Sequence, residues 1–274
     1  MKKADLHVHT VFSDGKFTPY QIIKEACRMD ITAVGITDHD TMSGIPQALQ
    51  AGRELNVEVV PGVELSTDFE GQEVHILGYY CNAENTLLKN TLAIVRMDRY
   101  NRIVKMLARL KELGIDLTLK DVLDMATEGE SLGRPHLAEA LCRKGYSGTS
   151  REAFQRFLST GKPAFVKRLK IAATVAIKII SKSGGVAVLA HPGLYKKDSL
   201  IPRLINHGLS GIEAFHPDHR LADCRRYWRI GQKYNLIITG GSDFHSQGLA
   251  SNSALGTVVV DYRCLQILKK VAGV

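Results

Sequence analysis

The feature that most constrains the fold is an alternation of short β-branched segments with amphipathic helical segments along the chain. Runs rich in Val and Ile predict strands, after a first strand that ends near His9, at residues 31–37, 57–63, 74–79, 186–190, 211–215 and 236–239. Helices are predicted between several of these strands, at residues 19–29, 44–55, 200–207 and 220–234. A β-α-β-α order predicts a parallel sheet or barrel covered by helices.

One region interrupts this alternation, because residues 98–163 contain helix-like segments and no strong strand pattern. Apolar residues recur there at helical spacing, ending at a glycine: Ile103, Met106, Leu107, Leu110, Leu113 and then Gly114. A chain of 274 residues is compatible with one large domain that carries an insertion. We therefore expect an α/β body of residues 1–97 and 164–274, with residues 98–163 inserted as a small helical domain that covers the active site.

Charge and cysteine content restrict the substrate and the compartment. The formal net charge of +8 favours an anionic substrate such as a nucleotide, a phosphate ester or RNA. The five cysteines are far apart and form no Cys-x-x-Cys pair, and the chain has neither an apolar leader nor a membrane-spanning apolar run. We expect a cytoplasmic enzyme without disulfides, membrane contact or an obligate protein partner.

Histidines and carboxylates are concentrated where predicted strands end. His7 and His9 lie two residues apart on the first strand, so both imidazoles point to the same face. Other candidates follow later strands: Asp14, His39, Glu64, His191, His216, Asp243 and His245. Loops after the carboxyl ends of strands build the active sites of barrels and open α/β sheets, so these side chains should converge. A single His-x-His pair is weak evidence, but the whole set predicts a nitrogen and oxygen site suited to Zn²⁺, Mn²⁺ or Fe²⁺.

In their order along the chain, these motifs resemble those of the PHP (polymerase and histidinol phosphatase) metallophosphoesterases. The resemblance extends over the length of the chain and includes Asp-Leu-His-x-His, Thr-Asp-His-Asp, Gly-Val-Glu, the isolated His75, Ala-His-Pro and Gly-Ser-Asp-x-His. It implies a distorted (β/α)7 barrel of the TIM-like PHP type and three divalent metal ions. Mn²⁺, Zn²⁺ and Fe²⁺ all remain candidates for these ions.

The same resemblance assigns a ligand set to each ion. His7, His9, Glu64 and Asp243 would hold the first ion, and Glu64 would bridge to a second ion held by His75 and His191. The third ion would be held by Asp14, His39 and His245. His75 is included on resemblance alone, because it lies near the start of its predicted strand. Three divalent ions leave such a cluster positive, which favours a dianionic phosphate and a metal-activated hydroxide as nucleophile.

Three further residues are candidates for binding substrate. Arg134 lies in a Gly-Arg-Pro-His segment of the insertion, which in the nucleotide-directed members that the chain resembles supplies an arginine to the substrate phosphate. His216, after a predicted strand, is a candidate for binding a second phosphate or for protonating the leaving oxygen. Lys167, with its neighbour Arg168, is a candidate phosphate contact where the insertion rejoins the barrel, although a solvated basic turn is an alternative.

The resemblance implies a metal-dependent phosphatase that removes the 3′-phosphate of 3′,5′-bisphosphonucleotides such as pAp and yields the 5′-monophosphate. A 5′→3′ exoribonuclease acting on short RNA and a histidinol phosphatase are alternatives within the family, and the helical insertion disfavours the latter. A cyclic amidohydrolase would place a carboxylated lysine where this chain has Glu64. A non-catalytic module that binds metal or oligonucleotide is a further alternative, disfavoured by the complete ligand set.

Overall fold

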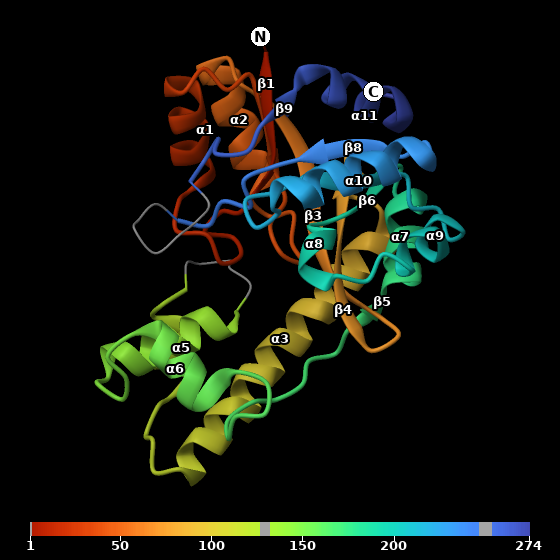
Figure 1. The fold of residues 1–274 in the computed structure, drawn as a ribbon. Coiled ribbons are helices and arrows are strands. Elements are labelled where there is room, and N and C mark those ends of the chain that lie inside the picture. The colour runs from red at the N-terminus through yellow and green to blue at the C-terminus, as the bar shows by residue number, and fades with distance from the viewer. Residues whose placement is uncertain (1, 127–131, 247–253) are drawn as a thin grey trace.

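The computed structural model describes residues 2–126, 132–246 and 254–274, and shows a mixed α/β fold built around a nearly closed, distorted barrel (Figure 1). Seven strands form its wall, as the sequence predicted: β1 (Lys3–Val8), β2 (Ala33–Ile36), β3 (Glu58–Phe69), β4 (Gln72–Tyr79), β6 (Val186–Leu189), β7 (Gly211–Phe215) and β8 (Ile237–Gly240). A bridge between Val8 and Phe244 brings the two ends of the sheet together. Two short strands extend the sheet: β9 (Val260–Asp261) pairs with the edge strand β1, and β5 (Ile171–Ala172) pairs with Thr67 and Asp68 near the end of β3.

The expectation of a uniformly parallel sheet is wrong at β4, which runs antiparallel to both β3 and β6. β3 does not end at residue 63 but continues to Phe69, where a hairpin reverses the chain. Glu70 and Gly71, the two turn residues, both have positive φ angles, of 54° and 80°. This is the backbone that a tight two-residue hairpin requires. Glu64 therefore lies within a long strand rather than after one.

Helices pack around the outside of the barrel (Figure 1). They are α1 (Pro19–Arg28), α2 (Ile45–Leu55), α7 (Ala173–Lys182), α8 (Pro192–Tyr195), α9 (Leu200–Ile205), α10 (Leu221–Lys233) and α11 (Tyr262–Ala272). The α1 helix begins where Thr18 and Gln21 form a reciprocal capping box, and it buries Ile22, Ile23 and Ala26. The apolar face of such a helix fixes how the adjoining strand ends are presented.

The helical insertion has a hydrophobic core of its own. It comprises most of α3 (Thr86–Glu112), α4 (Leu119–Leu123), α5 (Arg134–Arg143), α6 (Ser150–Ala153) and the π-helical turn η1 (Phe154–Leu158). Leu88 of α3 packs in the barrel core, whereas Ile103 and Leu110 of the same helix pack with Leu137 in the separate insertion core. Leu113, expected on the buried stripe, is instead 47% exposed because the helix ends there. Figure 1 shows α3 leading away from the barrel toward α5 and α6.

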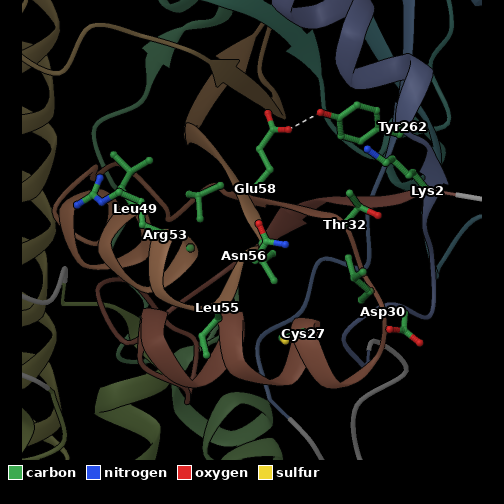
Figure 2. Close-up of a pocket in the computed structure, with 14 residues that line it drawn as sticks. Lys2, Cys27, Asp30, Thr32, Leu49, Arg53, Leu55, Asn56, Glu58 and Tyr262 are labelled. Carbon is green, nitrogen blue, oxygen red and sulfur yellow. Dashed lines mark hydrogen bonds between the residues drawn. The ribbon is translucent and has the colours of Figure 1, made fainter.

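A hollow of about 810 Å³ lies at the amino ends of the strands (Figure 2). It is bordered by the carboxyl ends of α1 and α2 and by Glu58, whose carboxylate accepts a hydrogen bond from the Tyr262 hydroxyl. In barrels of this kind the amino ends of the strands serve stability, and chemistry occurs at the carboxyl ends. Among the described residues, no helix is long and apolar enough to cross a membrane.

Candidate metal centre

The candidate centre begins with two buried histidines, His7 near the end of β1 and His9 directly after it. Leu6 and Val8 alternate with His7 and His9, so the apolar side chains enter the core while both imidazoles share the opposite face. The Nε2 atoms of His7 and His9 lie 3.2 Å apart. Two ring nitrogens this close, both fully buried, are arranged to share one cation.

Glu64 lies at the centre of the histidines and uses its two oxygens differently. Its Oε2 atom lies 3.4 Å from His7 Nε2, 3.3 Å from His9 Nε2 and 3.0 Å from His39 Nδ1. Its Oε1 atom lies 2.8 Å from His75 Nδ1 and 2.9 Å from His191 Nε2. A carboxylate in this position can bridge two ions, one on each oxygen.

A third group of ligand atoms surrounds Asp14. Its Oδ1 atom is 3.2 Å from His245 Nε2 and 3.8 Å from His9 Nδ1, and its Oδ2 atom is 3.9 Å from His39 Nε2. Asp243 completes the first group, because its Oδ1 atom lies 3.3 Å from His7 Nε2 and 3.1 Å from His9 Nε2. The structure thus brings all nine predicted metal ligands into one cluster.

Three subsets of these residues place their ligand atoms within 4.8 Å of one another. The subsets are His7, His9, Glu64 and Asp243; His9, Asp14, His39 and His245; and His39, Glu64 and His75. The first matches the set expected for the first ion. The other two differ from expectation, because His9 joins the Asp14 group and His39 joins Glu64 and His75, with His191 on the Oε1 side of Glu64.

Unsatisfied polar atoms show that these residues fit metal ions. Asp14 Oδ1, His39 Nδ1 and Glu64 Oε2 are buried and form no well-oriented hydrogen bond with a described residue, although Glu64 Oε2 and His39 Nδ1 face each other at 3.0 Å. A buried polar atom without a partner is costly, and coordination to a cation would remove that cost. A donor set of imidazole nitrogens and carboxylate oxygens, with no thiolate, suits Zn²⁺, Mn²⁺ or Fe²⁺.

The electrostatics of the cluster keep its carboxylates ionised and favour neutral imidazoles at His39 and His191. Burial opposes ionisation of Glu64, but nearby histidines hold its pKa well below the usual range. Burial likewise opposes ionisation of Asp14 and Asp243, and the histidines around them keep the pKa of each carboxyl low. Burial lowers the pKa of His39 and His191, which favours the neutral imidazole that coordinates a metal. In contrast, and against the effect of burial, nearby carboxylates raise the pKa of His7, His9, His75 and His245.

Two ligand positions have unusual backbone geometry. His191, directly after β6, has a φ of 27°, and Asp243, after β8, has a φ of 48°. Left-handed backbone at residues other than glycine costs free energy and tends to occur at functional sites. The strain is consistent with loops shaped to aim these side chains inward.

Glu213 on β7 supports two of the histidines, and the sequence reasoning missed it. Its Oε1 atom lies 3.0 Å from His7 Nδ1, and its Oε2 atom accepts a 2.8 Å hydrogen bond from the His191 backbone amide. The bond to Nδ1 fixes the His7 ring with Nε2 facing the other ligands. A signal was available, because Glu213 is the one charged residue in the buried strand segment Gly-Ile-Glu-Ala-Phe.

His216 lies beside the candidate metal ligands and contacts one of them, Asp243. Its Nε2 atom is 3.2 Å from Asp243 Oδ2, and its Nδ1 atom accepts a 3.1 Å hydrogen bond from the Asp218 backbone amide. Since Nδ1 accepts, Nε2 carries the proton and donates it to Asp243. This geometry makes His216 a support for Asp243.

Four arginines border the centre in a hollow of about 170 Å³ that also contains Asp14, His39 and His75. They are Arg99, Arg102, Arg134 and Arg168, of which the sequence reasoning selected Arg134 and mentioned Arg168. Lys167, the other candidate, is exposed and does not line this hollow. Arg99 and Arg102 are three residues apart on α3, so they share a helix face.

Within the part of the chain that the structure describes, two of these arginines have acidic partners and two do not. Arg99 Nε lies 2.9 Å from Asp40 Oδ2, and Arg168 Nη2 lies 2.9 Å from Glu73 Oε1. By contrast, the guanidinium groups of the other two donate to backbone carbonyls, Arg102 to Val166 at 2.7 Å and Arg134 to Leu158 at 3.4 Å. Neither of these two forms an ion pair with any residue that the structure describes.

The uncompensated charge is visible in the pKa of Arg102, which is lowered to about 10 by burial and by the neighbouring arginines Arg134, Arg168 and Arg99. The pKa of Arg134 is lowered by burial and by Arg99. An anion bound between Arg102 and Arg134 would relieve this repulsion. The hollow therefore combines metal-ligand groups with a separate site for an anionic group.

Asp38 and Asp40 shape the loop around His39. Asp38 accepts hydrogen bonds from the Thr10 backbone amide at 2.7 Å and from Ser13 Oγ at 2.6 Å. Asp40 accepts from the Ser66 amide at 3.0 Å as well as from Arg99. Both carboxylates thus hold neighbouring segments in place around the cluster.

The chain matches a known family and several characterised relatives. A model of the PHP domain matches residues 5–166. A phosphoribosyl 1,2-cyclic phosphate 1,2-diphosphodiesterase from Eggerthella lenta is 35% identical over 89% of this chain and 94% of its own length. A 3′,5′-nucleoside bisphosphate phosphatase from Chromobacterium violaceum is 32% identical over 90% of this chain and 89% of its own. A 5′-3′ exoribonuclease from Haemophilus influenzae is 31% identical over 89% and 90%, respectively.

The fold also matches a solved structure over nearly its whole length. A protein from Bifidobacterium adolescentis, described as a metal-dependent phosphoesterase, superimposes with a TM-score of 0.91 at 30% sequence identity. The match covers 98% of this chain and 96% of that protein. The arrangement of barrel and helical insertion is therefore shared as a unit.

Proposed function

The chain belongs to the PHP domain family and is a metal-dependent phosphoesterase, and from this premise we propose that it removes the 3′-phosphate of 3′,5′-bisphosphonucleotides such as pAp. The observation that carries the proposal is the hollow in which two kinds of anion-binding group adjoin. Asp14, His39 and His75 present metal-ligand atoms there, and Arg102 and Arg134 present guanidinium groups that form no ion pair with a described residue. A substrate with two phosphates would use both.

The cofactor in this proposal is a set of three divalent ions, with Mn²⁺, Zn²⁺ and Fe²⁺ as candidates. The nine predicted ligands would hold them, with Glu64 between the two sides of the cluster. When bound, such ions polarise a phosphoryl oxygen and supply a hydroxide nucleophile at neutral pH. Glu213 fixes the orientation of His7, and His216 fixes that of Asp243.

The arginines supply orientation rather than bond cleavage. Arg102 and Arg134 would bind the 5′-phosphate, which leaves the 3′-phosphate at the metal ligands. A guanidinium group binds phosphate through paired hydrogen bonds, so it fixes both position and angle. Arg99 and Arg168 already have carboxylate partners, and we assign them the role of holding the wall of the hollow.

A second candidate function is hydrolysis of a cyclic phosphate diester that carries another phosphate. The observation that favours it is the 35% identity to the Eggerthella lenta phosphoribosyl 1,2-cyclic phosphate 1,2-diphosphodiesterase. Its named substrate also combines two phosphate groups. Hydrolysis of short RNA from its 5′ end is a related activity, supported by the similarity to the Haemophilus influenzae exoribonuclease.

The test is an assay of the Mn²⁺-loaded protein on pAp, 5′-AMP, phosphoribosyl 1,2-cyclic phosphate, histidinol phosphate and a short 5′-phosphorylated RNA. Products are separated by chromatography and released phosphate is measured. We expect 5′-AMP to accumulate from pAp, with little further hydrolysis, because 5′-AMP lacks the second phosphate. A clear preference for the cyclic diester or for histidinol phosphate would replace the proposed substrate.

A further inference from the structure

We propose that a groove along α10 binds the 3′ continuation of a single-stranded RNA whose 5′-phosphate lies on Arg102 and Arg134 and whose next phosphate lies at the metal ligands, with Trp228 stacking on a base. The proposal rests on the proposed function, because it extends a bisphosphorylated mononucleotide substrate to a strand. It assigns a binding role to a surface outside the metal centre and the arginine hollow.

The groove consists of two adjoining hollows of about 570 Å³ and 670 Å³, both bordered by Phe215 and Val259. The first hollow is lined by His216 and Leu221, and the second by Trp228 together with Ile267 and other apolar side chains. α10 and α11 both pack on β8, and side chains from both helices line the second hollow. A cleft of this size, with an apolar lining and few polar groups, is typical of a ligand site.

The groove starts next to the metal ligands. His216 lines its first hollow, and the Nε2 atom of this residue is 3.2 Å from Asp243 Oδ2. The arginine hollow lies at the β3–β4 side of the centre, whereas the groove lies at β7 and β8, with β6 between them in the sheet. A strand with its 5′-phosphate on the arginines and its next phosphate at the metals would therefore leave toward α10.

The side chains along α10 suit a nucleic-acid strand. Trp228 is the single tryptophan of the sequence, and it is 47% exposed. Arg225, Trp228, Arg229 and Gln232 follow one another at intervals that place them on adjoining parts of one helix face. Exposed aromatic rings flanked by cations bind bases by stacking and phosphates by charge.

Charge selects RNA over a second copy of the chain as the occupant. Arg225 and Arg229 are exposed, and neither forms an ion pair with a described residue, whereas Arg226 pairs with Asp198. Two copies packed through this face would bring free guanidinium groups together, which like-charge repulsion opposes. Asp261 at the groove is already engaged at the start of α11, where it accepts a hydrogen bond from the Arg263 amide.

The first experiment compares two substrates in the Mn²⁺-loaded enzyme carrying Trp228→Ala. We expect kcat/KM for a 5′-phosphorylated eight-nucleotide RNA to fall about tenfold, since loss of one stacked base has an effect of this order. The value for pAp should not change, because pAp does not reach the groove. Tyr20→Ala, which removes an aromatic ring that is 44% exposed on α1, is the matched control and should affect neither substrate.

The second experiment uses the emission of Trp228 in stopped-flow mixing with the Mn²⁺-loaded wild-type enzyme. We expect the eight-nucleotide RNA to quench this emission and pAp to leave it unchanged. The double variant Arg225→Gln/Arg229→Gln keeps the indole of Trp228. It should show weaker quenching by the RNA, and the quenching should depend less on salt concentration. If Trp228→Ala does not fold, this double variant tests the groove in its place.

Three results would overturn the groove assignment: equal effects of Trp228→Ala on RNA and pAp, no effect on either, or a wild-type dimer that this variant dissociates. The last result would identify an interface between copies. If the wild type hydrolyses no pAp but RNA still quenches Trp228, the proposed function fails while the groove stands. If pAp is hydrolysed and RNA causes no quenching, the groove fails alone.

Discussion

At the scale of single residues, Glu64 determines how the ligand groups divide. Its Oε2 atom faces His39 at 3.0 Å, and its Oε1 atom faces His75 at 2.8 Å. Ser66 on the same strand is in register with His75, which places Glu64 and His75 diagonally on one face of the β3–β4 hairpin. Single substitutions should therefore affect one part of the cluster at a time.

Replacing His39 with Ala should remove one of the three ions and most of the activity while the barrel stays folded. The reason is that His39 faces both Asp14 and Glu64, so its loss removes a ligand atom from the group around each of these carboxylates. Metal content is measured by elemental analysis and folding by circular dichroism. His207→Ala, at an exposed histidine after α9, is the control and should retain full metal. Unchanged metal in His39→Ala would contradict the ligand assignment.

Replacing Arg134 with Ala should lower kcat/KM for pAp by roughly 10- to 100-fold, the effect of losing a charged hydrogen bond of about 1.5–3 kcal/mol. Arg134 forms no ion pair with a described residue, so its removal breaks no ion pair among them. Steady-state kinetics measure the effect, with Arg151→Ala on the exposed part of α6 as control. Wild-type kinetics in Arg134→Ala would assign this arginine a structural role only.

Replacing Glu213 with Gln should weaken Mn²⁺ binding by about 10- to 100-fold, as loss of a residue that orients a metal ligand typically does. The amide oxygen of the introduced glutamine can accept the hydrogen bond from His7 Nδ1. The amide nitrogen then faces the His191 backbone N–H, and since both groups are donors this hydrogen bond is lost. Titration calorimetry measures the affinity. Glu58→Gln, at the opposite end of the barrel, is the control (Figure 2). Equal affinities in the two variants would remove Glu213 from the site.

That most of the candidate metal ligands would converge could be predicted from the sequence because local rules apply to them, whereas His75 was included on resemblance alone. Residues two apart on a strand share a face, as His7 and His9 do, and loops after parallel strands meet at one end. Glu213 was missed because its partner His7 is 206 residues away, and no local pattern links them. Arg102 was missed because a single arginine on a long helix resembles any solvated residue.

At the scale of elements, two features were not predictable from periodicity. The turn at Glu70 and Gly71 reverses the chain between two runs that each look like a strand of a parallel sheet. α3 serves both cores, since Leu88 packs in the barrel and Leu110 in the insertion. The proposed boundary at residue 98 thus falls inside one continuous helix, which would couple the position of Arg102 to both bodies.

Replacing Leu110 with Ala should destabilise the insertion by about 2–5 kcal/mol, the range for deleting a fully buried leucine side chain. Hydrogen exchange measured by mass spectrometry should increase in peptides from residues 98–163 and stay unchanged in the barrel. Metal content should remain, and activity should fall because Arg102 and Arg134 lose their support. Leu113→Ala, at an exposed leucine of the same helix, is the control. Increased exchange throughout the barrel would show that the insertion is not a separate unit.

At the scale of the whole molecule, the barrel supplies metal ligands and the helical insertion supplies arginines, Arg102 and Arg134 among them, to the same hollow. Asp14, His39 and His75 come from the barrel, and Arg134 comes from α5. This division separates the two tasks of the proposed reaction, in which cleavage belongs to the barrel and recognition of the second phosphate to the insertion. The sequence predicted the barrel, but which arginines meet the ligands depends on how the barrel and the proposed insertion pack together.

The measurement that tests this account most directly is a crystal structure of the protein with Mn²⁺ and the product 5′-AMP, using anomalous scattering to locate the metal. The account predicts three Mn²⁺ peaks held by the nine predicted ligands, with the 5′-phosphate of AMP bound to Arg102 and Arg134. Manganese outside this cluster, or a 5′-phosphate bound away from both arginines while the ions occupy their predicted places, would contradict it.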